Sequence, residues 1–125
     1  MTPSKPAKEF YFKEGCYIQE WHNSAQDPDM SIARVRVEPN AETRLHALTN
    51  TSERYIILSG EAETSVNHQS REVKQGDVVV IPAGAPQKIR NRLDTDLVFL
   101  AVCQPRFQEH NYQDLEDFAH DLKGA

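Results

Sequence analysis

The sequence has no long hydrophobic run. None of its 125 residues lies in a stretch that approaches the roughly 20 apolar residues of a membrane-spanning helix. The opening segment, Met1 to Lys8, also lacks the apolar region of a secretory signal. We therefore expect no membrane association and, by default, a cytoplasmic protein.

Cysteine is scarce. The only two, Cys16 and Cys103, lie far apart and fit neither a zinc-ribbon nor a redox spacing. A framework of several disulfides, as in small secreted domains, is excluded, and we expect two free thiols in a reducing compartment.

Net positive charge is also lacking. The chain has 14 Lys and Arg residues against 19 Asp and Glu residues, which gives a formal charge of −5. A nucleic-acid-binding protein needs a basic surface to neutralise phosphates, so we expect no nucleic-acid partner. Several arginines lie in the middle of the chain, so the net charge does not exclude binding of an anionic small ligand.

What the sequence does have is a series of short β-patterned segments separated by Gly, Pro, Asn and Asp. The length fits one domain. Spacings of roughly 8–12 residues favour an antiparallel all-β sandwich or barrel over alternating strands and helices. The segment at 22–29 reads as a polar loop. The predicted strands are two short ones about Gly15 within 9–21, then 31–38, 44–48, 54–60, 61–67, 69–74, 78–81, 87–91 and 97–103.

A helical pattern follows the strands. Apolar residues recur at helical spacing from Tyr112 to Leu122, Asn111 can cap the start and Gly124 can end the segment. The helix would pack on the barrel or on a partner subunit. The predicted parts are a flexible leader over residues 1–8, a β-barrel over 9–107 and a C-terminal α-helix over 108–125.

Two segments carry fixed spacings. In the first, His46-Ala-Leu48 is followed after four residues by Glu53, and Gly60 follows six residues later. The second runs from Gly76 to Asn91 and contains Pro82, Gly84 and Gln87. These spacings resemble the paired motifs of the cupin superfamily, which implies an antiparallel double-stranded β-helix, or jelly roll.

The sequence departs from the family motifs at three positions. Asn40 stands where the first glycine belongs, Leu48 replaces the second histidine, and Gln87 replaces the histidine of the second motif. The stretch 31–37 and the tail 103–107 are similar to small stand-alone bacterial cupins. The resemblance covers most of the chain beyond the leader.

In typical cupins the motif histidines and glutamate bind one divalent transition metal, Zn, Fe, Mn or Ni, which suit imidazole and carboxylate donors. Here the resemblance leaves His46, Glu53 and Gln87 as candidate ligands, and Leu48 offers no donor. Two interpretations stay open. One is a weakened metal site, and the other is a site without metal in which these side chains bond each other or a ligand.

Strand parity brings further side chains toward the same barrel mouth. Buried beside His46, Glu53 can act as a general acid or base, since burial raises the pKa of a carboxyl group. The alternative is a polar pair that only orders the barrel. Cys103 also fits a small core residue. The predicted catalytic residues are Glu53 and His46, and the predicted substrate-binding residues are Arg44, Tyr55, Gln87 and Cys103.

From these features we expect a cupin-type small-molecule enzyme with isomerase, epimerase or lyase chemistry on a sugar-like or other oxygenated metabolite. The alternative is a non-catalytic small-molecule-binding cupin, a sensor or carrier that has lost its metal. We also expect a homodimer, by resemblance to other small cupins and because the apolar runs at 55–58 and 97–102 exceed what one small barrel interior requires.

Overall fold

The structure is a computed structural model that describes residues 7–116. Within this part of the chain, eleven strands and one short 3₁₀ turn make up the regular structure. The elements are β1 (Phe10–Phe12), β2 (Cys16–Ser24), β3 (Asp27–Val37), β4 (His46–Leu48), β5 (Ser52–Ser59), β6 (Glu61–Val66), β7 (Gln69–Lys74), β8 (Val78–Ile81), β9 (Gln87–Asn91), β10 (Leu97–Gln104), η1 (Glu109–Asn111) and β11 (Tyr112–Asp114).

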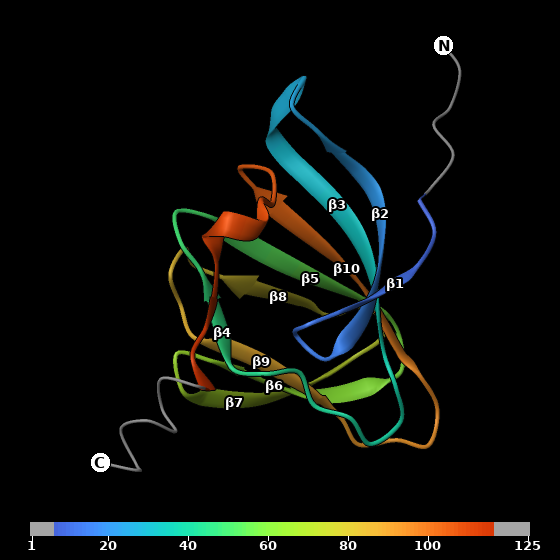
Figure 1. Ribbon diagram of the computed structural model, residues 1–125. Coiled ribbons are helices and arrows are strands. Elements are labelled where there is room, and N and C mark those ends of the chain that lie inside the picture. Colours follow the sequence, from blue (N-terminus) through green and yellow to red (C-terminus); the bar gives the residue numbers. More distant parts are fainter. Residues whose placement is uncertain (1–6, 117–125) are drawn as a thin grey trace.

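The strands form two antiparallel sheets that face each other (Figure 1). The six-stranded sheet has the order β1-β2-β3-β10-β5-β8, and the five-stranded sheet has the order β11-β4-β9-β6-β7. The predicted fold class, an essentially all-β jelly roll, is confirmed.

Buried and exposed side chains alternate along the strands, and the buried ones form the core between the two sheets. On β10 the side chains of Leu97, Phe99, Ala101 and Cys103 are buried, as their shared parity predicted. This strand pairs with β3 on one side and β5 on the other, and both neighbours turn apolar side chains to the same interior. The centre of the six-stranded sheet therefore supplies most of the apolar wall.

Side-chain contacts join the edges of the two sheets. At one edge the ring of Phe12 on β1 makes edge-to-face contacts with Tyr112 on β11, at a centroid distance of 5.3 Å, and with Phe107 at 6.2 Å. At the other edge Arg71 on β7 donates to the carbonyl oxygen of Val78 on β8 at 3.3 Å. Two of these aromatic residues, Phe12 and Phe107, also line the cavity described in the next subsection.

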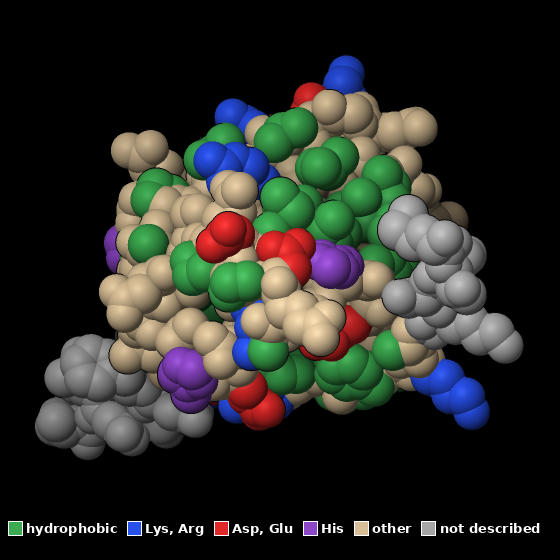
Figure 2. Space-filling view, turned by 90° about the horizontal axis from the view of Figure 1, so that it is seen from above, with side chains coloured by type: hydrophobic (Ala, Val, Ile, Leu, Met, Phe, Trp, Pro, Cys, Tyr) green, Lys and Arg blue, Asp and Glu red, His purple; other side chains and the backbone are tan. Residues whose placement is uncertain are grey.

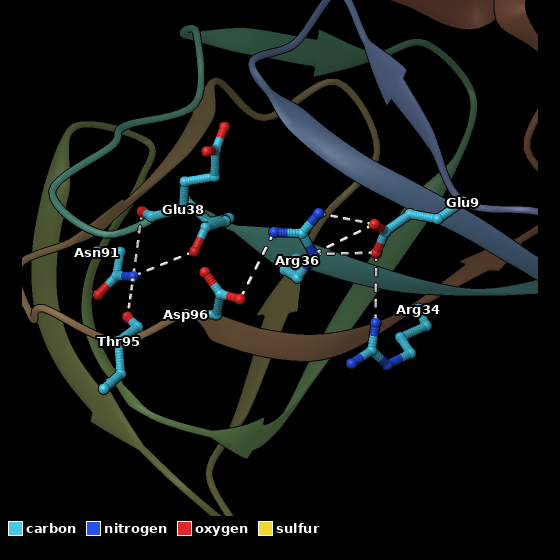
Figure 3. A network of polar contacts seen from close by, with 8 residues as sticks. Glu9, Arg34, Arg36, Glu38, Asn91, Thr95 and Asp96 are labelled. Atoms are coloured by element: carbon cyan, nitrogen blue, oxygen red, sulfur yellow. Dashed lines mark hydrogen bonds and ion pairs between the residues drawn. The ribbon is translucent and has the colours of Figure 1, made fainter.

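An ion-pair network holds the start of β1 against the outer side of the barrel (Figure 3). The carboxylate of Glu9 accepts from Arg36 at 2.7 Å and lies 3.5 Å from Arg34. Arg36 also lies 3.5 Å from Asp96 and 4.2 Å above the ring of Tyr17. These contacts fix the direction in which β1 enters its turn with β2.

Asn91, the last position of the second motif, has a structural role. Its buried amide nitrogen donates to the carbonyl oxygens of Val37 at 3.1 Å, Glu38 at 3.2 Å and Thr95 at 2.8 Å (Figure 3). One side chain thus satisfies three backbone acceptors where three segments meet.

The structure differs from the sequence prediction in the segment 22–29 and in the residue at which the C-terminal helix starts. The segment 22–29 is a hairpin, with Ser24 opposite Asp27, and its polar sequence reflects a tip that projects beyond the barrel (Figure 1). The predicted helix does not start at Asn111, because residues 109–114 form η1 and β11, and helical backbone first appears at Glu116. Pairing of β11 with the open edge of β4 outweighs the local helical spacing.

The remainder of the predicted helix, residues 117–125, and most of the predicted leader, residues 1–6, lie outside the described residues. The proposed division into leader, barrel and helix therefore stays a prediction. No helix in residues 7–116 has the length and apolar character required to cross a membrane.

Candidate functional site

A cavity of about 60 Å³ lies against the inner face of the six-stranded sheet. Aromatic and aliphatic side chains form most of its wall. On the face that carries the β2–β3 hairpin and η1, hydrophobic side chains gather beside acidic ones and a histidine (Figure 2). The polar residues that line the cavity are Glu14, Glu20, Asn23, Ser31, Glu53, Tyr55 and Cys103.

Glu53 points into this cavity from β5 and is 7% exposed. The Cys103 thiol, on the register partner in β10, donates to its Oε2 atom at 3.6 Å. Within residues 7–116, Oε1 has no hydrogen-bond partner. Burial and the nearby Glu14 carboxylate raise the pKa of Glu53 to about 7, against the opposing effects of His46, Gln87 and Cys103. Near neutral pH the side chain therefore populates both protonation states.

His46 lies behind the cavity wall, buried in β4. Its Nε2 atom is 2.8 Å from Oε1 of Glu14, and its Nδ1 atom donates to the carbonyl oxygen of Arg44 at 2.7 Å. Burial acts to lower the pKa of His46, but Glu14 and the Arg44 carbonyl outweigh burial and raise it. Because both ring nitrogens face acceptors, the geometry favours an imidazolium paired with Glu14.

Glu14 is the site residue that sequence reasoning missed. It lies in the turn between β1 and β2, where its carbonyl oxygen accepts from the Arg44 backbone at 2.8 Å. Its Oε2 atom accepts from the Cys16 thiol at 3.4 Å. Gly15, at φ +99°, lets this turn fold back against Glu42. A glutamate before a turn glycine gives no sequence signal that it points inward.

Tyr55 and Gln87 join the two sheets beside Glu53. The Tyr55 hydroxyl donates to Oε1 of Gln87 at 2.6 Å, and both side chains are buried. Gln87 is the register partner of His46. The structure thus brings together five of the six predicted site residues: His46, Glu53, Tyr55, Gln87 and Cys103.

The side chain of Arg44 points away from this group, although its carbonyl oxygen accepts from His46. Its guanidinium donates to Asp114 at 2.7 Å and lies 3.7 Å from Glu116, and it does not line the cavity. The parity argument extended beyond the start of β4, which begins at His46. A role for Arg44 in substrate binding stays a prediction that its position does not support.

The donor set does not fit the metal that the fold implies. No three His, Cys, Asp or Glu side chains of the described residues cluster closely enough to hold an ion. Both nitrogens of His46 are engaged, the Gln87 oxygen accepts from Tyr55, and Leu48 is apolar. A metal held by His46, Glu53 and Gln87 stays a prediction that this hydrogen bonding disfavours.

Comparison with known families decides the superfamily. A family model described as a cupin domain matches residues 33–103. This chain belongs to the cupin family. It is similar to an uncharacterised protein of Methanocaldococcus jannaschii, with 30% identity over 87% of this chain and 89% of that protein.

Two further relatives of this cupin have names that refer to oxalate. An oxalate-binding protein of Thermotoga maritima is 36% identical over 65% of this chain and 64% of its own length. Oxalate decarboxylase of Bacillus subtilis is 30% identical over 79% of this chain, but the match covers only 26% of that enzyme.

Solved structures confirm the cupin fold at low sequence identity. A structure of Streptomyces Pac13 with uridine superposes with a TM-score of 0.76 and 19% identity over 91% of each chain. The formate complex of Lactobacillus farciminis oxalate decarboxylase has a TM-score of 0.76 and 22% identity, over 92% of this chain and 35% of the other.

Proposed function

We propose that this cupin is a small-molecule enzyme that transfers a proton through Glu53, in an isomerisation, epimerisation or elimination on an oxygenated metabolite. One observation carries the proposal. A carboxyl group with a pKa of about 7 and an unpartnered oxygen points into a largely apolar cavity. A general acid or base works best when its pKa lies near the working pH.

The cavity wall supports a reacting centre without charge. No Lys, Arg or His lines the cavity among the described residues. In the proposed step, the Glu53 carboxylate takes a proton from a C–H bond of the substrate next to a carbonyl group. The electron pair of that C–H bond forms an enolate, with the negative charge on the carbonyl oxygen. The protonated Glu53 then returns the proton to carbon, or to a leaving oxygen, so that no oxidant or reductant is required.

The Tyr55 hydroxyl and the His46–Glu14 pair are positioned to assist this step. Tyr55 lines the cavity and is held by Gln87, so its ring and hydroxyl keep a fixed orientation beside Glu53. The His46 imidazolium favours the ionised form of Glu53, and the Glu14 carboxylate opposes it. Burial and Glu14 raise the pKa of Glu53, and His46 limits the rise, so that the pKa lies at about 7.

The test is solvent exchange. Small hydroxyaldehydes, hydroxyketones and 2-oxo acids are incubated with the protein in D₂O, and NMR follows replacement of C–H by C–D. We expect exchange with at least one compound class and a loss of roughly 100-fold or more in Glu53→Gln. Glu61→Gln, which changes an exposed carboxylate on β6, serves as the matched control and should keep the rate.

A rate in Glu53→Gln equal to that of the unsubstituted protein would overturn the proposed role of Glu53. Binding of a compound in the cavity without any exchange or elimination would favour the second candidate function, a non-catalytic small-molecule-binding protein. The 36% identity to an oxalate-binding protein supports that candidate. Equilibrium dialysis with radiolabelled oxalate distinguishes an oxalate-binding function directly.

A further inference from the structure

An outer hollow lies next to the cavity that contains Glu53. The two spaces share five lining residues, namely Phe10, Phe12, Glu20, Asn23 and Phe107. The outer hollow adds four residues from the segment after β10, which are Arg106, Gln108, Glu109 and His110. This segment therefore forms one side of the cavity mouth.

Arg106 is held rigidly at this mouth by neutral partners. Its backbone N–H donates to the Pro28 carbonyl oxygen at 3.1 Å. Its guanidinium donates to Oδ1 of Asn23 at 3.0 Å and to Oε1 of Gln108 at 3.5 Å. Asn23 is fixed in turn, because its amide nitrogen donates to the Phe107 carbonyl oxygen at 2.9 Å. The guanidinium is therefore oriented before any ligand arrives.

No carboxylate of residues 7–116 forms an ion pair with Arg106, whereas Arg36 and Arg92 each pair with two carboxylates. A guanidinium has five N–H donors, and the two amide oxygens use only part of them. A carboxylate or phosphoryl group is the strongest acceptor for the remaining donors, because both partners are then charged.

The other titratable side chains that line the outer hollow are those of Glu20, Glu109 and His110. Glu109 lies 3.3 Å from Lys13, which offsets its charge. Glu20 lines both the cavity and the outer hollow. Three glutamates, Glu14, Glu20 and Glu53, line the cavity and disfavour an anion inside it, so the anionic end of a ligand is best placed outside, at Arg106.

We propose that Arg106 binds an anionic oxygen group of the ligand, a carboxylate or a phosphoryl group, at the mouth, while the uncharged reacting centre lies beside Glu53. This inference deepens the proposed function and rests on it for the ligand that fills the cavity. Arg106 is then a specificity-determining residue, and the substrate class is a small oxygenated acid or phosphate ester with the charged group at one end.

The experiment is an NMR titration of the full chain with propionate, methyl phosphate and the neutral analogue propionamide. We expect Arg106→Gln to weaken the preferred anion roughly 10-fold and to leave propionamide binding unchanged. Arg90→Gln, which removes an exposed arginine on β9, is the matched charge control and should have little effect. Glu20→Gln should strengthen anion binding, because it removes a repelling charge.

The comparison of propionate with methyl phosphate identifies which anionic group the mouth prefers. Equal weakening in Arg106→Gln and Arg90→Gln, or no binding of either anion to the unsubstituted protein, would overturn the proposal. Arg106→Lys and circular dichroism separate lost charge recognition from misfolding. Arg106-dependent anion binding without solvent exchange would contradict the proton-transfer function alone, whereas exchange that is insensitive to Arg106→Gln would contradict this inference alone.

Discussion

At the scale of single residues, the interior of this barrel concentrates ionisable groups that burial forces to interact. Glu14, His46 and Glu53 come from a turn and two strands, and the carboxylate of Glu14 acts to raise the pKa of both His46 and Glu53. The thiols of Cys16 and Cys103 each donate to one of the carboxylates, and burial raises the pKa of both thiols. The cysteines therefore act as weak donors in this cluster rather than as nucleophiles.

The raised pKa of Glu53 predicts a stability that falls as pH rises. Its pKa is about 7 in the folded state against 4.5 as the ordinary value, so between these values the folded protein holds a proton that the unfolded chain releases. The free energy of unfolding should decrease across this window by about 3 kcal/mol. The raised pKa of His46 acts in the same direction, since its stabilisation is lost as pH rises through the folded-state value.

Thermal unfolding from about pH 5 to about pH 8 measures this effect. Glu53→Gln should flatten the decline in melting temperature and raise stability at the alkaline end, because the amide carries no charge to desolvate. Glu61→Gln, at an exposed site on β6, should reproduce the slope of the unsubstituted protein. An unchanged slope in Glu53→Gln would contradict a raised pKa.

Much of the site could be predicted from sequence at this scale. The motif spacings predicted that His46, Glu53 and Gln87 share one region, and strand parity added Tyr55 and Cys103. Neither the motif spacings nor strand parity could identify Glu14 as a site residue, because the direction of a side chain in a turn depends on what the turn packs against. The predicted role of His46 as a free ligand missed its pairing with Glu14 for the same reason.

At the scale of elements, turns with little tolerance for a side chain set the corners of the barrel. Gly60 connects β5 to β6 at φ +100°, and an added Cβ would lie 3.3 Å from Cα of Leu97 at the start of β10. Gly76, before β8, has a similar φ of +91° but nothing within 4 Å of such a Cβ. Substitutions at the two glycines therefore distinguish the cost of a left-handed backbone, which both share, from the cost of steric crowding, which only Gly60 has.

We expect Gly76→Ala to lower the free energy of unfolding by about 1 kcal/mol, the usual cost of a left-handed backbone with a side chain. Gly60→Ala should lower it by about 1 kcal/mol more, because the backbone of β10 must shift to admit the methyl group. Urea unfolding of the two variants in parallel tests the difference. Equal losses would show that β10 accommodates the methyl group without cost.

The strands themselves were largely predictable, because alternation of buried and exposed positions is a local signal. Strands β5 to β10 lie where the sequence pattern placed them. The pattern failed where burial does not alternate, as in the projecting hairpin around residues 24–27, and where a non-local partner decides, as for β11 against β4. A segment that becomes a strand by pairing with a distant segment need not show the alternating hydrophobic pattern of a strand in its own sequence.

At the scale of the whole molecule, the outer side of the six-stranded sheet carries apolar side chains at its β8 edge. Leu58 on β5 and Val78 and Val80 on β8 are large hydrophobic side chains that remain exposed, Val80 by 58%. β8 is also a terminal strand of its sheet. Exposed apolar side chains on a sheet edge favour association with a second surface.

A second copy of the chain is the partner that the sequence analysis predicted, and we expect a homodimer through this edge. Sedimentation equilibrium should then give twice the chain mass of 14.3 kDa. Val80→Lys places a charge in the contact and should shift the mass toward the monomer without lowering the melting temperature of the fold. Gln113→Lys adds the same charge on β11, at the far edge of the other sheet, and should leave the dimer intact. A mass of 14.3 kDa at every protein concentration would refute the dimer. It would show that the exposed apolar side chains on β8 remain in contact with water in the native protein.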